Sequence, residues 1–95
     1  MSDPRTTRSV RVANRQGLHA RAVVLLAEFS RRFQARIELI TEDQRRAATT
    51  DVLQMLTLGC EQGEQLELAA TGCDAEAALD ALAELFAQKF GEDPD

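Results

Sequence analysis

Seven segments with regular hydrophobic spacing follow one another along the 95 residues, and their order restricts the possible folds. Four short segments have the form of strands bounded by turns, and three have the apolar spacing of helices. The expected strands are Arg8–Ala13, Arg36–Thr41, Arg45–Thr49 and Gln65–Thr71, and the expected helices are Ala20–Arg32, Val52–Leu58 and Ala75–Lys89. The order βαββαβα predicts an α+β open-faced β-sandwich, in which a four-stranded, mostly antiparallel sheet carries three helices on one face.

The length predicts a single domain over residues 1–95, with an ordered core over about residues 8–90. Only 4% of the residues are aromatic, so aliphatic side chains must fill most of the core. The last helix contributes Leu79, Leu82, Phe86 and Phe90 at helical spacing. The stretch Gly91–Asp95 is an acidic tail that we expect to fray.

Two aspartates stand where helices are expected to begin. The carboxylate of Asp51 can accept hydrogen bonds from the free N–H groups of the second helix, which Gly59 ends. Asp74 is expected to cap the last helix in the same way.

The formal charge of −5 disfavours a nucleic-acid-binding protein, which usually has a basic surface. The pairs Arg31–Arg32 and Arg45–Arg46 are interpreted as solvated surface. No apolar run is long enough for a membrane helix, and the polar stretch Met1–Arg8 lacks the apolar core of a signal peptide. We therefore expect a cytoplasmic protein that does not bind a membrane.

Cys60 and Cys73 lack the spacing of metal ligands, and the chain has one histidine to join them. We expect reduced cysteines, no metal and no cofactor, although a disulfide between the two stays open. The chain also lacks a glycine-rich nucleotide loop with its lysine.

That single histidine, His19, stands where a loop ends and the first long helix begins. A helix N-terminus favours anions such as phosphate, because its first N–H groups are unpaired and its dipole is positive there. A phosphoryl group on His19 could lie over the amides of Ala20 and Arg21, and the Arg21 guanidinium could add a charge-assisted contact. A neutral imidazole can attack phosphorus. The plainer alternative is a polar capping residue on the surface.

The segment Gly17–Leu18–His19–Ala20–Arg21 resembles the active-site motif of the HPr family, the histidine phosphocarriers of the bacterial phosphotransferase system. The segment Asp51–Gly59 is similar to the second helix of that family, and the resemblance extends over about residues 8–90. It implies an open-faced β-sandwich with three helices. It also implies that His19 is phosphorylated on Nδ1 and that Arg21 contacts the phosphate.

Two residues depart from the family pattern. Ala22 replaces a proline, and a modest effect is expected because alanine also suits a first helical turn. Asp51 stands where many members have a serine that a kinase phosphorylates for regulation. We interpret Asp51 as a helix cap rather than as a mimic of phosphoserine.

The short second helix carries more apolar residues than it can bury. We predict that Leu53 and Leu56 join Val24 as an apolar docking rim around His19, with burial in the core as the open alternative. Met55 and Leu58 are expected in the core. A small rim suits brief encounters with several partners.

The resemblance implies a carrier protein rather than an enzyme. An Enzyme I-like partner that uses phosphoenolpyruvate would phosphorylate His19, and an Enzyme IIA-like partner would accept the phosphoryl group from a monomeric carrier. The alternative is a regulatory module of the same fold, similar to the nitrogen-related NPr branch, in which His19 phosphorylation signals rather than feeds sugar uptake. A nucleic-acid module of similar size is disfavoured by the charge and the few aromatic residues.

Overall fold

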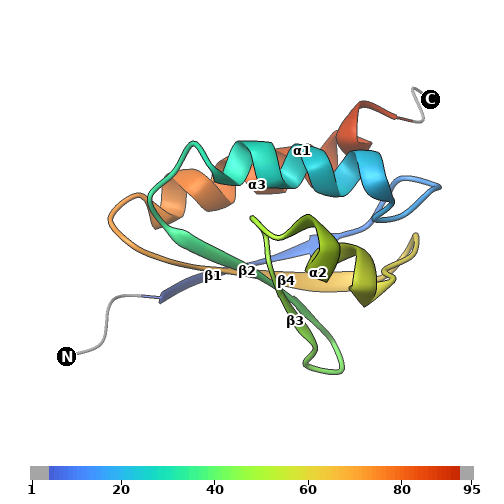
Figure 1. Cartoon of the computed structure of the whole chain (residues 1–95), viewed down its shortest axis with the longest axis horizontal. Helices are drawn as coiled ribbons and strands as arrows, with labels where there is room; N and C mark the ends of the chain where they lie inside the picture. The colour runs from blue at the N-terminus through green and yellow to red at the C-terminus, as the bar shows by residue number, and fades with distance from the viewer. Residues whose placement is uncertain (1–4, 93–95) are drawn as a thin grey trace.

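The computed structural model describes residues 5–92 and contains one four-stranded sheet with helices packed on a single face (Figure 1). The strands are β1 (Arg5–Arg11), β2 (Arg36–Thr41), β3 (Arg46–Ala48) and β4 (Gln65–Thr71). The helices are α1 (Ala20–Ser30), α2 (Val52–Leu58) and α3 (Ala75–Ala87), followed by a 3₁₀ turn, η1 (Lys89–Gly91). The predicted fold class and element order are confirmed.

The strand order β1-β4-β2-β3, with every neighbouring pair antiparallel, explains why one face is covered. β1 and β2 run parallel with β4 between them, and β3 and β4 run parallel with β2 between them. Crossovers between parallel strands are almost always right-handed. α1 connects β1 to β2, and α2 connects β3 to β4. The two connections cross the sheet in opposite directions, and their strand pairs also run in opposite directions. Two right-handed connections of this kind place α1 and α2 on the same face of the sheet.

The core fills the space between this face and the helices. Leu68 of β4 pairs with Leu39 of β2, and Leu39 pairs with Ala47 of β3, so one row of buried side chains crosses three strands. The predicted stripe of the last helix is confirmed, and its members are at most 2% exposed: Leu79, Leu82, Phe86 and Phe90. Burying each such side chain contributes about 1.5–3 kcal/mol.

Several predicted boundaries were wrong by a few residues. The first strand runs over Arg5–Arg11 rather than Arg8–Ala13, because β4 supplies partners as far as Thr71, which pairs with Arg5. Val12 is still fully buried, and its N–H donates to the Glu64 carbonyl over 2.9 Å. The first helix ends at Ser30, the third strand covers three residues only, and the last helix ends at Ala87.

Asp51 caps α2 as predicted, since its carboxylate accepts from the Gln54 N–H over 3.0 Å. The prediction for Asp74 was wrong, because its side chain makes no capping bond to α3. Instead its two carboxylate oxygens accept from the backbone N–H groups of Gln34 and Ala35, both over 2.8 Å. Asp74 therefore ties the turn after α1 to the start of α3.

An Asp74→Ala substitution is expected to lower the free energy of unfolding by about 2–3 kcal/mol, since hydrogen bonds to a charged group are lost and the Ala35 N–H is partly buried. Urea denaturation measures this loss. Asp80→Ala is the matched control. It removes an ion pair with Arg8 in which the aspartate side chain is 68% exposed, so it should cost under about 1 kcal/mol. Equal losses in both variants would contradict the assignment.

Candidate functional site

His19 is the residue immediately before α1, as predicted. Its backbone is extended, and the first helical hydrogen bond runs from the Val23 N–H to the His19 carbonyl over 3.1 Å. The N–H groups of Ala20, Arg21 and Ala22 therefore precede the first helical bond and have no acceptor within the helix. The imidazole makes no capping bond, which contradicts the interpretation of His19 as a capping side chain.

The two side chains of the predicted site differ in exposure. The His19 side chain is 27% exposed, so the ring is supported on one side and open on another. Arg21 lies in the first turn of α1 and is exposed. Within residues 5–92 its guanidinium has no hydrogen bond or ion pair. It therefore remains available to an anion.

The loop before His19 is fixed by a buried side chain that sequence reasoning missed. Asn14 is fully buried, and its Nδ2 donates to the Gly17 carbonyl over 2.8 Å. Gly17 has a φ of 69°, and the next residue, Leu18, donates its N–H to the Cys60 carbonyl over 3.0 Å. Burial raises the pKa of the Cys60 thiol to about 12, so this cysteine is inert. The loop is thus anchored at both ends.

Glu92 is the second residue that the sequence did not predict at the site. Its Oε2 lies 2.5 Å from His19 Nε2, and its Oε1 accepts from Asn14 Nδ2 over 3.0 Å. The Glu92 side chain is only 7% exposed. The prediction of fraying from residue 91 was therefore wrong for Gly91 and Glu92, while the rest of that tail lies outside the described residues.

The chain returns to His19 through a left-handed turn. Lys89, Phe90 and Gly91 have φ values of 56°, 55° and 77°. Left-handed backbone costs roughly 1–2 kcal/mol for each residue with a side chain. Phe90 offsets this cost, since its ring is buried and packs edge-on against Phe86 with 5.0 Å between centroids. Figure 1 shows this red turn above the start of α1.

The structure separates the apolar residues of α1 and α2 into exposed and buried sets. Val24 is 42% exposed, Leu53 is 73% exposed and Leu56 is 36% exposed. Met55 and Leu58 are buried, as predicted. Because α1 packs against α2, the exposed set belongs to two adjacent helices.

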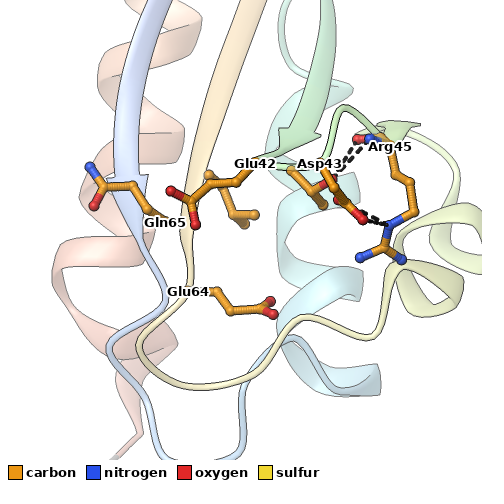
Figure 2. A pocket seen from close by; sticks show the side chains of 7 residues that line it. Glu42, Asp43, Arg45, Glu64 and Gln65 are labelled. Atoms are coloured by element: carbon orange, nitrogen blue, oxygen red, sulfur yellow. Dashed lines mark hydrogen bonds and ion pairs between the residues drawn. The ribbon is translucent and has the colours of Figure 1, made fainter.

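A separate polar hollow, which His19 does not line, lies between the β2–β3 turn and the start of β4 (Figure 2). The hydrogen bond from the Thr41 hydroxyl, followed by that from Arg45, lowers the pKa of the Asp43 carboxyl. Arg45 Nε lies 3.0 Å from Asp43, and its other end donates to the Leu58 carbonyl at the C-terminus of α2 over 3.0 Å. The hydrogen bonds of Arg45 to Asp43 and to the Leu58 carbonyl therefore tie the β2–β3 turn to the C-terminus of α2.

No group of three or more histidine, cysteine, aspartate or glutamate side chains in residues 5–92 could hold a metal ion. In the same part of the chain, no helix is long and apolar enough to cross a membrane. Both cysteines are free thiols.

The model of the PTS HPr component phosphorylation site matches residues 6–88. The chain belongs to the HPr family of phosphocarrier proteins. Members of this family carry phosphate rather than catalyse a reaction, so the chain is a phosphocarrier of the phosphotransferase system and not an enzyme.

Curated relatives agree with this assignment. The chain is 37% identical over 86 residues to the phosphocarrier protein NPr of Proteus mirabilis, with 90% of this chain and 96% of the relative covered. It is 36% identical over 86 residues to the phosphocarrier protein HPr of Treponema pallidum, with coverage of 90% and 97%. The crystal structure of HPr-C-His from Thermoanaerobacter tengcongensis superposes with a TM-score of 0.87 at 30% identity, with 93% of this chain and 98% of that chain covered.

Proposed function

We propose that His19 is the residue on which this HPr-family protein carries its phosphoryl group. The observation that carries the proposal is the position of the partly exposed imidazole directly before the unpaired N–H groups of α1. In this proposal Nδ1 takes the phosphoryl group, the amides of Ala20 and Arg21 bind its oxygens, and the Arg21 guanidinium adds charge. Phosphoryl transfer needs positioning and charge stabilisation more than acid–base chemistry, and these groups supply both.

The proposed donor is an Enzyme I-like protein that uses phosphoenolpyruvate, and the proposed acceptor is an Enzyme IIA-like protein. Both would meet a cytoplasmic, monomeric carrier formed by one domain. Asp51, whose carboxylate accepts from the Gln54 N–H and caps α2, is proposed to act as that cap rather than as a mimic of phosphoserine.

Val24, Leu53 and Leu56 are proposed to form the docking rim for both partners. Their exposure on two adjacent helices supports a contact surface, since apolar side chains exposed together favour binding. The surface is small, which suits a carrier that must leave one partner to reach the next.

A Leu53→Ala substitution should raise the apparent KM of Enzyme I for the carrier about 5- to 30-fold, as expected for the loss of 1–2 kcal/mol of binding. Its unfolding free energy should stay within about 0.5 kcal/mol of wild type, since the side chain is exposed. Steady-state kinetics and urea denaturation measure the two quantities. Leu58→Ala, at a buried position of α2, is the control and should instead lose about 2–5 kcal/mol of stability. A destabilised Leu53→Ala variant with unchanged KM would place Leu53 in the core.

The second candidate is a regulatory carrier of the NPr type. It is favoured by the relatives named NPr, at 35–39% identity, although a relative named HPr is equally similar. Loss of the gene distinguishes the two, because a sugar-transport carrier would give an uptake defect and a regulatory carrier would alter regulation with normal uptake.

Incubation with a purified Enzyme I and phosphoenolpyruvate tests the proposed acceptor role. The expected product is a stoichiometric, acid-labile phosphoprotein that migrates separately on a phosphate-affinity gel. Absence of any acid-labile phosphate would end the proposal.

A further inference from the structure

We propose that Glu92 is a positioning residue that fixes the proton of His19 on Nε2 and so leaves the lone pair on Nδ1. This inference rests on the proposed acceptor role of His19. It adds a carboxylate from the C-terminal turn to a site that is otherwise built from the start of α1.

The contact between the two side chains determines the tautomer. An ionised carboxylate has acceptors only, so Glu92 Oε2, 2.5 Å from Nε2, requires a proton on that nitrogen. In a neutral ring with Nε2 protonated, Nδ1 carries the lone pair. A carboxylate that binds the second nitrogen of a histidine also fixes the orientation of the ring.

Glu92 is itself held in place. Asn14 Nδ2 donates to Glu92 Oε1 over 3.0 Å and to the Gly17 carbonyl over 2.8 Å, so the buried amide connects the glutamate to the loop before His19. Both partners of Nδ2 are acceptors, which fixes the orientation of the Asn14 amide. Its Oδ1 has no hydrogen-bond partner among the residues described. Buried polar atoms are rarely left without a partner. The unpaired Asn14 Oδ1 accompanies the amide orientation that lets Nδ2 donate to Glu92.

The backbone gives independent support for this role. Lys89 and Phe90, neither of them glycine, adopt left-handed φ values in the turn that brings Glu92 back to the start of α1. Strained backbone persists where the surrounding structure enforces it, and it concentrates at functional sites.

The carboxylate also balances the charge of the transfer step. The Nδ1 lone pair forms the new nitrogen–phosphorus bond while the bond between phosphorus and the donor's leaving atom breaks, and that electron pair stays with the donor. The ring keeps its Nε2 proton and becomes cationic, because both nitrogens are now substituted. Glu92 then faces a positive ring, and the phosphoryl group on the other nitrogen faces the amides of α1 and Arg21. When the phosphoryl group passes to the acceptor protein, the nitrogen–phosphorus bond breaks, its electron pair stays on Nδ1 and the ring becomes neutral again.

A Glu92→Gln substitution tests the tautomer directly. Asn14 Nδ2 will hold the carboxamide oxygen, so the NH₂ group will face His19 and donate to Nε2. The proton of the neutral ring should therefore move to Nδ1, the nitrogen that must attack. Nitrogen-15 NMR of the unphosphorylated ring across a pH titration measures the tautomer, with mainly Nε2–H expected in the wild type and mainly Nδ1–H in the variant.

The transfer rate gives a second readout. In metal sites, loss of a carboxylate that orients a ligating histidine costs about 10- to 100-fold in activity, and we expect a loss in the same range here. Glu92→Gln should lower the initial rate of phosphorylation by that amount, and Glu92→Ala should lower it less, because the ring is then free to adopt either tautomer. A merely structural role predicts the opposite order, since alanine removes more packing. Glu76→Gln, at an exposed position in the first turn of α3, makes the same change of charge and should leave the rate unchanged.

The outcomes separate this inference from the proposed function. If wild type is phosphorylated on His19 while Glu92→Gln keeps the wild-type tautomer and rate, the role of Glu92 is wrong and the acceptor role stands. If wild type takes up no phosphoryl group, the acceptor role itself is wrong. A rate for Glu92→Ala below that for Glu92→Gln would also overturn the positioning role. Circular dichroism of each variant confirms that it is folded.

Discussion

Replacing His19 with alanine will abolish phosphorylation by Enzyme I and phosphoenolpyruvate. The expected loss is complete, because His19 is the only histidine among the 95 residues and no other imidazole can replace it. The fold should survive, since the imidazole makes no capping bond to α1 and its side chain is 27% exposed. Phosphate-affinity electrophoresis before and after acid treatment measures the effect.

Two controls give this result its meaning. Wild-type protein must form the acid-labile species in the same reaction, and the thermal melts of wild type and variant must agree within a few degrees. An acid-labile phosphate on the His19→Ala variant would contradict the proposed site.

A large loss of stability is expected from Gly17→Ala. Gly17 has a φ of 69°, and a Cβ atom there would lie 2.6 Å from the Cys60 carbonyl oxygen. The left-handed backbone costs roughly 1–2 kcal/mol with a side chain. The overlap adds ~1–3 kcal/mol because the opposing atom belongs to the backbone. The variant should therefore lose several kcal/mol in urea denaturation.

This substitution should also slow phosphoryl transfer. The same Cys60 carbonyl accepts from the Leu18 N–H, so displacing it moves the residue next to His19. Gly59→Ala is the matched control, because Gly59 has a similar φ of 64° and a Cβ atom there meets nothing within 4 Å. It should cost only the backbone share, roughly 1–2 kcal/mol. Equal losses at the two glycines would rule out the predicted clash.

Element type and order could be predicted because each segment carries its own periodicity. β2, α2 and β4 have the predicted bounds, since turns or glycine mark their ends in the local sequence. The first strand was misplaced because residues 5–7 are polar and become strand only through pairing with β4. Asp74 was misassigned for a similar reason: its backbone partners are about 40 residues away in the chain.

Two residues of the candidate site, His19 and Arg21, could be predicted from the sequence, and two others, Asn14 and Glu92, could not. His19 and Arg21 are close in the chain and share a motif with a helix start. Asn14 and Glu92 are 78 residues apart, and acidic composition at the end of the chain favoured a frayed tail. Phe90 was the available signal, because its helical spacing from Phe86 placed it in the core and therefore anchored the residues beside it.

Phosphorus-31 and nitrogen-15 NMR of the protein after reaction with Enzyme I and phosphoenolpyruvate test the account most directly. A ring nitrogen bonded to phosphorus must reside on the only histidine, and the coupling identifies which nitrogen it is. We predict one phosphohistidine with phosphorus on Nδ1 of His19 and a proton retained on Nε2, where Glu92 accepts it. Phosphorus bound to Nε2, or to any residue other than His19, would contradict the account.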